Sequence, residues 1–302
     1  MNGQVFQRRT GTDSLSQQYG GIHARGWVDR LPASWIPYVQ LSRLSPPAGL
    51  LLIYFPHLFG VIHTTSVHER HLSHVAYVSF ILLGGSFFCN NASHAWNDFV
   101  DAFIDTLVAR TKTRPIPRGA ITRRAAFLDT AIITVPNIIV TTYYLYAKRH
   151  THLLQMVLGF SLGADAPWRD HAIMCLFIAS ISWVVIFDTI YAYQDVDDDL
   201  RYGIKSMAVL LQGRAKPLLF SLCLFMCLFL ITSGYLAKMG FLYYLVTVGV
   251  STWFVVFMVV KVDLHDLASC WHWFSRGFLL TGFAIAIGLL IECVGQVDPT
   301  IY

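Results

Sequence analysis

Long runs of apolar residues alternate along this chain with short polar connections. Seven runs are long enough to cross a bilayer as a helix, because about 20 residues rising about 1.5 Å each span a hydrocarbon core of about 30 Å. They occupy residues 49–65, 75–96, 125–147, 172–193, 217–236, 241–260 and 277–294. An eighth run, 153–164, is about half the required length and indicates a re-entrant or incomplete span. The pattern predicts an all-α, multi-pass transmembrane bundle of seven to eight spans.

Composition supports a membrane protein. Of the 302 residues, 55% are hydrophobic and 13% charged, whereas about a quarter of a soluble domain is charged. Mean hydropathy of +0.52 excludes a disordered chain and a polar nucleic-acid-binding domain, so we expect membrane lipid as a partner and no nucleic acid. Residues 1–33 are polar and lack the apolar stretch of a secretory signal, which predicts a flexible tail before a transmembrane domain at 34–302.

Basic residues concentrate in two of the connections. The first group follows the second span and comprises Arg110, Lys112, Arg114, Arg118, Arg123 and Arg124; the second follows the 172–193 span and comprises Arg201, Lys205, Arg214 and Lys216. Positive charge marks cytosolic loops. We therefore expect both groups on the same, cytosolic side of the membrane.

Three aspartates lie at the end of the second span. On a continuous helix, Asp98, Asp101 and Asp105 fall within about 60° of one another, so their carboxylates share one face. Like charges in this arrangement repel, and a bound cation relieves the repulsion. Carboxylate oxygens suit Mg²⁺ completed by water and substrate phosphate.

A second acidic cluster follows the 172–193 span. Asp195, Asp198 and Asp199 lie on one arc of a helix, and Asp188 lies two turns deeper on nearly the same line. A charge as deep as Asp188 must be paired or functional, because burying it in the bilayer costs several kcal/mol. Each cluster alone fits ordinary juxtamembrane charge. Two matched clusters with basic residues beside them favour a divalent-metal clamp for a diphosphate.

The same residues carry a resemblance to a known family. UbiA-type intramembrane prenyltransferases have the signatures N-D-x-x-D-x-x-x-D and Y-A-x-x-D-x-x-D-D, and residues 97–105 and 191–199 match both in full. The entry to the first span, residues 35–57, resembles the fungal branch that prenylates aromatic polyketides during meroterpenoid biosynthesis. The resemblance extends from about residue 34 to the C-terminus.

This resemblance implies a UbiA-type helical bundle in which Mg²⁺, held by both motifs, binds the diphosphate of an allylic donor such as farnesyl diphosphate. The expected metal ligands are Asp98, Asp101, Asp105, Asp195, Asp198 and Asp199, and the expected diphosphate-binding residues are Asn97, Arg110, Lys112, Arg114 and Lys205. The expected catalytic residues are Asp98, Asp195, Tyr191 and Arg43, of which Arg43 and Tyr191 are expected near the aromatic acceptor. An electron-rich phenol, here an aromatic polyketide, would attack the allylic cation.

The chain departs from the family pattern in one region. Family members resemble nine-helix bundles, yet between Gly119 and Lys148 there is room for only one span where the family has two. Roughly one helix is missing. A single crossing there would place Lys148 and Arg149 on the side opposite the diphosphate, so either the local path differs or the role of this pair is lost.

Three alternatives stay open. One is a 4-hydroxybenzoate polyprenyltransferase of ubiquinone synthesis in the mitochondrial inner membrane, although the N-terminus lacks a long Arg-rich amphipathic helix. The second is an intramembrane terpene cyclase. The third, an ion-coupled transporter, normally has acids near the membrane midplane, whereas these acids lie at helix ends. The main interpretation is an aromatic prenyltransferase of the endoplasmic reticulum or a related endomembrane.

Overall fold

The computed structural model describes residues 27–67, 72–131 and 170–297, and within these ranges every regular element is helical. The longer elements are α3 (Ala48–Val67), α4 (Leu72–Val100), α6 (Arg123–Ala131), α9 (His171–Ala192), α12 (Ala215–Leu236), α13 (Ser251–Lys261) and α14 (Leu267–Val297). Shorter elements are η1 (Val28–Arg30), α2 (Ile36–Leu41), α5 (Ala102–Leu107), η2 (Thr111–Thr113), α10 (Val196–Tyr202) and α11 (Met207–Leu210), and the π-helical turns η4 (Tyr243–Val250) run directly into α13.

Six of these helical stretches are long and apolar enough to cross a membrane. They are Ala48–Val67, Val75–Val100, His171–Ala192, Ala215–Leu236, Tyr243–Lys261 and Leu267–Gln296. All six were predicted from hydropathy. The predicted span at 125–147 is described only as far as the end of α6 at Ala131, and the apolar run at 153–164 lies outside the described residues. The predicted flexibility of residues 1–33 stays a prediction, since the described part of that segment begins at Trp27.

The last span is longer than its apolar run indicated. We predicted it from residue 277, whereas α14 begins ten residues earlier, at Leu267. The carboxylate of Asp266 explains the early start, because it accepts hydrogen bonds from the backbone N–H groups of Ala268 and Ser269, both at 3.1 Å. Such a cap satisfies N–H groups that have no partner inside the helix.

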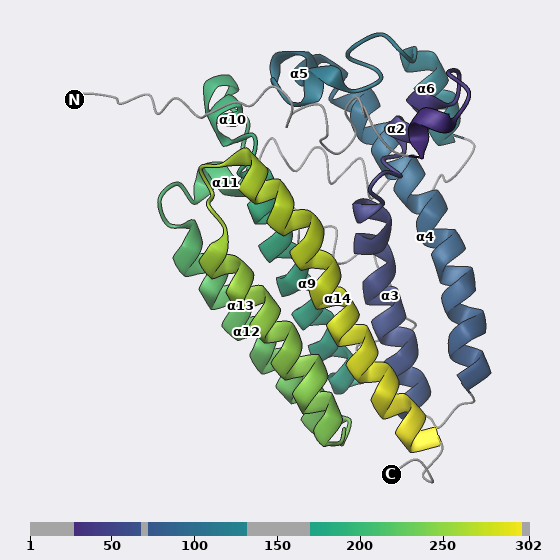
Figure 1. The fold of residues 1–302 in the computed structure, drawn as a ribbon, viewed down its shortest axis with the longest axis vertical. Coiled ribbons are helices and arrows are strands. Elements are labelled where there is room, and N and C mark those ends of the chain that lie inside the picture. The colour runs from purple at the N-terminus through teal and green to yellow at the C-terminus, as the bar shows by residue number, and fades with distance from the viewer. Residues whose placement is uncertain (1–26, 68–71, 132–169, 298–302) are drawn as a thin grey trace.

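The membrane helices stand side by side, and the short helices gather at one end (Figure 1). At that end α4 leads into α5, and α9 leads into α10, while the C-terminal end of α14 lies at the other. The first basic group follows α5 or begins α6, and the second group extends from α10 past α11 to the start of α12. Both groups therefore lie at the same end of the bundle, as predicted, while their placement on the cytosolic side of a membrane stays a prediction.

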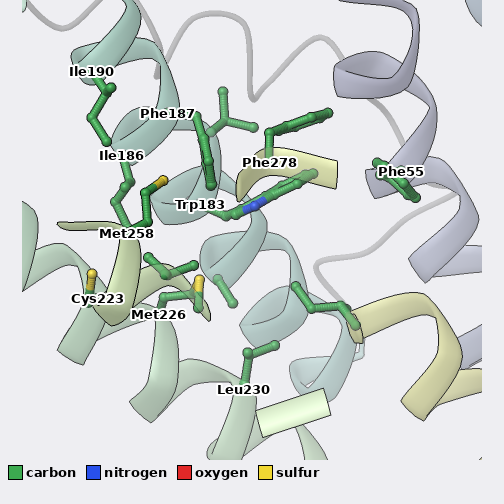
Figure 2. Packing of buried hydrophobic residues seen from close by; sticks show 14 of the residues in the cluster. Phe55, Trp183, Ile186, Phe187, Ile190, Cys223, Met226, Leu230, Met258 and Phe278 are labelled. Atoms are coloured by element: carbon green, nitrogen blue, oxygen red, sulfur yellow. The ribbon is translucent and has the colours of Figure 1, made fainter. Parts of the chain in front are cut away.

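Aromatic, aliphatic and sulfur-containing side chains fill the centre of the bundle (Figure 2). Trp183 of α9 stacks on Phe278 of α14, with ring centroids 4.5 Å apart and an interplanar angle of 12°. Phe55 of α3 meets the edge of Trp183 at 5.9 Å. In a bilayer, van der Waals packing rather than water exclusion holds helices together. These stacked rings therefore join α3, α9 and α14 into the scaffold on which the charged end is built.

Glycines on α14 allow this close packing. A β-carbon added at Gly282 would lie 2.7 Å from the ring of Phe55, and one at Gly277 would lie 2.8 Å from the sulfur of Met258. Real side chains do not approach so closely. Small residues at these positions let α14 lie against α3 and α13.

This packing predicts the effect of one methyl group. We expect Gly282→Ala to lower the free energy of unfolding by about 1–3 kcal/mol, because the ring of Phe55 has to move. Gly84→Ala on α4 is the matched control, since a β-carbon there meets nothing within 4 Å. Melting temperatures in one detergent, followed by tryptophan fluorescence, compare the two variants. Equal melting temperatures would contradict the packing described here.

Candidate active site

The first aspartate motif does not lie on one continuous helix, contrary to our prediction. Helix α4 ends at Val100, and Asp101, with φ −85° and ψ 2°, separates it from α5. The prediction extrapolated 100° per residue through this break. The break is consistent with the negative charges of the motif, because an uninterrupted helix would keep three mutually repelling carboxylates on one face. In the same way, Asp195 precedes α10 and lies outside α9.

Arginines neutralise the first motif. Arg43 donates a hydrogen bond of 2.6 Å to Oδ1 of Asp98, and Arg114 donates to the same oxygen at 3.3 Å. Arg114 also donates to Asp105 at 2.8 Å. Asp98 is completely buried, with 0% exposure, and Asp105 is buried as well. Two positive charges thus face two buried carboxylates.

Arg43 comes from outside both motifs. It follows α2 in the left-handed region, with φ 50°, which few residues other than glycine adopt. The preceding backbone is fixed to α4, because the side-chain amide of Asn90 donates to the carbonyl of Ser42 at 2.9 Å. The α2–α3 connection therefore delivers a buried guanidinium to Asp98.

The second motif is neutralised by Arg110, which lies between the two motifs in the sequence. Arg110 forms two hydrogen bonds with the carboxylate of Asp195, one of them 2.7 Å from Nε to Oδ1. It also donates to the hydroxyl of Tyr191 at 2.8 Å. The backbone N–H of Ala109 donates to Asp198 at 2.9 Å. Bidentate arginine–carboxylate pairs of this kind are among the stronger side-chain interactions.

Residues 108–114, which we call the bridging segment, connect the two motifs. Arg114 binds carboxylates of the first motif, whereas Arg110 and the N–H of Ala109 bind carboxylates of the second. The structure therefore brings both aspartate motifs to one place, although 90 residues separate Asp105 from Asp195 in the sequence. Arg110 and Arg114 were predicted to bind diphosphate, and here they pair with the aspartates.

The remaining predicted residues have more open surroundings. Lys112 and Lys205 are exposed, while Asn97 and Asp101 are half-buried. Asp199 is buried on α10. The ring of Tyr191 lies 4.7 Å from that of Phe274, so this tyrosine joins the charged cluster to the apolar interior. The two lysines are the accessible cations among the predicted diphosphate-binding residues.

Burial and charge shift several pKa values. Burial raises the pKa of Asp105, and the negative charges of Asp98 and Asp101 raise it further, against the opposing effect of Arg114. For Arg110, burial lowers the pKa, but the charge and hydrogen bond of Asp195, together with Tyr191 and Asp105, outweigh burial and leave the pKa above its ordinary value. Burial also lowers the pKa of Arg114, but the charges of Asp105 and Asp98 together leave this pKa above its ordinary value. Both arginines therefore stay charged.

The residues fit a hard divalent cation by their chemistry. The ligands on offer are carboxylate oxygens, and Oδ2 of Asp98 is buried without a hydrogen-bond partner. Within the described ranges, no group of three or more His, Cys, Asp or Glu side chains is close enough to bind one metal ion jointly. The guanidinium groups of Arg43, Arg110 and Arg114 neutralise these carboxylates as the structure stands.

Sequence reasoning missed several supporting residues. Gln40 accepts a hydrogen bond from Arg118, which also donates to the backbone carbonyl of Thr113 at 2.6 Å and so fixes the end of the bridging segment. The amide of Asn90 and the backbone N–H of Ala109 were missed too. No residue-type signal points to a backbone donor or to a neutral amide on a membrane helix.

The pairing of Arg110 with Asp195 predicts an energetic coupling. We expect Arg110→Gln alone to destabilise the detergent-solubilised protein by about 3–5 kcal/mol, because it leaves a partly buried carboxylate unpaired. The double variant Arg110→Gln/Asp195→Asn should lose less than the sum of the single variants. Arg201→Gln, which removes an exposed charge at the same end of the bundle, is the control. Additive losses in a double-mutant cycle would show that the pair is not coupled.

Comparison with solved structures shows the fold. A UbiA homologue from Aeropyrum pernix K1, solved without ligand, superimposes with a TM-score of 0.58 and 17% identity, covering 83% of this chain and 98% of that one. A digeranylgeranylglyceryl phosphate synthase gives a TM-score of 0.53 at 15% identity, covering 87% of this chain. The bundle predicted from the sequence is thus of UbiA type.

Relatives in sequence are prenyltransferases. The prenyltransferase ascA of Acremonium egyptiacum is 34% identical over 86% of this chain and 88% of its own length. The prenyltransferase stbC of Stachybotrys bisbyi is 30% identical over 90% of this chain and 92% of its own. The mitochondrial 4-hydroxybenzoate polyprenyltransferase of Schizosaccharomyces pombe is 27% identical over 96% of this chain and 88% of its own.

These alignments also show that this chain lacks residues that the two fungal relatives have. The ascA alignment has 295 positions, whereas 86% of 302 residues is about 260, so about 35 positions have no residue of this chain. For stbC the alignment has 307 positions and 90% of the chain is about 272 residues, which again leaves about 35. The difference approximates one membrane helix of about 20 residues with a connection. Lys148 and Arg149 lie outside the described residues.

A protein-family model matches the sequence of this chain. The description of that model is "UbiA prenyltransferase family", and it matches residues 53–135 and 128–283. The two matches share residues 128–135, which lie in the region where the sequence predicted a missing helix. Together they cover most of the chain and include both aspartate motifs. The chain belongs to the UbiA prenyltransferase family.

Proposed function

We propose that this prenyltransferase transfers a prenyl group of farnesyl length from an allylic diphosphate to the ring of an aromatic polyketide phenol. The reaction would belong to fungal meroterpenoid assembly in the endoplasmic reticulum or a related endomembrane. One observation carries the proposal: Arg110, Arg114 and the backbone of the bridging segment join two aspartate motifs at one end of an apolar bundle, and Arg43 pairs with the first motif there. Such an end suits a charged diphosphate with an isoprenoid tail below it.

The arginines have a defined task in this proposal. Arg110 and Arg114 remain charged, and their guanidinium groups present several donors in a fixed geometry that matches phosphate oxygens. Exposed Lys112 and Lys205 add positive charge where a diphosphate would enter. Donors on these side chains would stabilise the charge that develops on the departing diphosphate.

The motif carboxylates have a second task. Asp98, Asp101 and Asp105 on one side, and Asp195, Asp198 and Asp199 on the other, would hold Mg²⁺, and the free Oδ2 of Asp98 supports this assignment. When bound, Mg²⁺ supplies positive charge that offsets the charge of the diphosphate. Arginines released from the carboxylates are then available to phosphate oxygens.

The acceptor would lie between the charged end and the apolar interior. Tyr191 joins these regions, because its hydroxyl accepts from Arg110 and its ring packs on Phe274. The apolar surroundings exclude water, which would otherwise capture the allylic cation. As the phenol ring attacks, its proton passes to a motif carboxylate or to diphosphate.

A second function is supported by one relative. The polyprenyltransferase of Schizosaccharomyces pombe acts on 4-hydroxybenzoate by its name and aligns with 96% of this chain. A 4-hydroxybenzoate acceptor is therefore the alternative to a polyketide phenol. The aromatic polyketide is favoured by the resemblance of residues 35–57 to the fungal branch and by the two fungal prenyltransferases at 30–34% identity.

The acceptor can be identified directly. Membranes that contain the chain are incubated with farnesyl diphosphate, Mg²⁺ and a panel of orsellinic-acid-type phenols and 4-hydroxybenzoate, and products are measured by mass spectrometry with an EDTA control. We expect metal-dependent product on the polyketide phenols. Product on 4-hydroxybenzoate alone would favour the alternative, and no product from folded protein would contradict both.

The role of the first motif predicts one severe variant. Asp98→Asn should lower prenyl transfer by about 100-fold or more, because it removes a negatively charged metal ligand without changing side-chain size. Asp197→Asn is the control, since Asp197 is exposed on α10. Turnover is measured on equal amounts of membrane-inserted protein. Near-normal turnover of Asp98→Asn would overturn the metal-clamp assignment.

A further inference from the structure

We infer that Arg43 is a positioning residue: it holds Asp98 in place and, by competing with a divalent cation for that carboxylate, sets the metal affinity of the first motif. The inference rests on the proposed function and goes beyond it. It concerns a residue that lies outside both aspartate motifs and that the sequence analysis placed near the aromatic acceptor.

Geometry gives Arg43 a specific relation to Asp98. The guanidinium and the carboxylate are both buried, at 6% and 0% exposure, and 2.6 Å apart. The left-handed backbone of Arg43 and the bond from Asn90 to Ser42 fix the connection that carries it. The guanidinium is therefore preorganised against α4.

The two oxygens of Asp98 have different surroundings. Oδ1 accepts from both Arg43 and Arg114, whereas Oδ2 is buried and has no hydrogen-bond partner. Two donors on one oxygen fix the carboxylate plane and leave the other oxygen available for a cation. An unpartnered buried carboxylate oxygen is unfavourable unless a ligand completes it.

The same pairing opposes metal binding. A fixed guanidinium beside Asp98 repels an incoming divalent cation, and in a partly buried site this repulsion is weakly screened. Arg114 is shared between Asp98 and Asp105 and belongs to the bridging segment, so it can turn toward a phosphate. Arg43 sits on a connection held to α4 at Ser42. It therefore remains a local positive charge that lowers metal affinity in the absence of donor.

Metal binding without donor tests this inference. Mn²⁺ serves as the probe, and free Mn²⁺ is measured by electron paramagnetic resonance on the purified full-length protein in detergent. We expect Arg43→Gln to lower the Kd for Mn²⁺ by about five- to ten-fold, because one neighbouring positive charge is removed. Arg43→Lys keeps the charge but loses the planar fork, and should stay within about two-fold of wild type.

Arg123→Gln is the matched control. It removes one positive charge at the same end of the bundle, where Arg123 donates to the backbone carbonyl of Phe99 and to no motif carboxylate that the structure records. Its Kd for Mn²⁺ should not change by more than about two-fold. An equal tightening in Arg123→Gln would show that overall charge, and not the position of Arg43, controls the affinity.

The outcomes separate this inference from the proposed function. An unchanged or weaker Mn²⁺ affinity in Arg43→Gln, with wild type binding normally, would overturn the role of Arg43 alone. If Arg43→Gln does not fold, Arg43→Lys decides: a Kd more than about two-fold from wild type would contradict a role based on charge. Failure of every form to bind Mn²⁺ would overturn both. The expected Mn²⁺ shifts without prenyl transfer to any acceptor would contradict only the proposed function.

Discussion

Six carboxylates gathered at one end of an apolar bundle repel one another, and the structure of this end depends on how arginines neutralise them. The bridging segment is the central part, because Arg114 pairs with the first motif and Arg110 with the second. These bonds join residues that are far apart in the sequence. Together with the bond from the backbone N–H of Ala109 to Asp198, they fix one motif relative to the other.

The apolar scaffold and the charged end depend on each other. Stacking of Trp183 on Phe278 fixes α9 against α14, and α9 carries Tyr191 to the charged end. Tyr191 then accepts from Arg110 and packs on Phe274 of α14. The position of the second motif thus follows from aromatic packing several turns deeper in the bundle. This is why a rigid core matters to a site made of short helices and loops.

Much of this arrangement could be predicted from the sequence. Apolar length identified all six spans that the structure describes, because a helix needs about 20 mostly apolar residues to cross the hydrocarbon core. The motif residues were recognised by type and spacing. The break at Asp101 was not, since a helical projection assumes that the helix continues. The partners of Arg43 and Arg110 were also missed, because they are set by tertiary contacts that spacing does not encode.

Binding of the donor is the most direct test of the account, because about 35 positions of the ascA alignment have no residue in this chain while both motifs and the bridging segment are intact. Binding of a non-hydrolysable farnesyl thiolodiphosphate to the purified protein should be measured by calorimetry with and without Mg²⁺. The account predicts saturable binding that strengthens at least about ten-fold with Mg²⁺. Folded protein that does not bind the analogue, or binds it equally well without metal, would contradict the two-motif clamp.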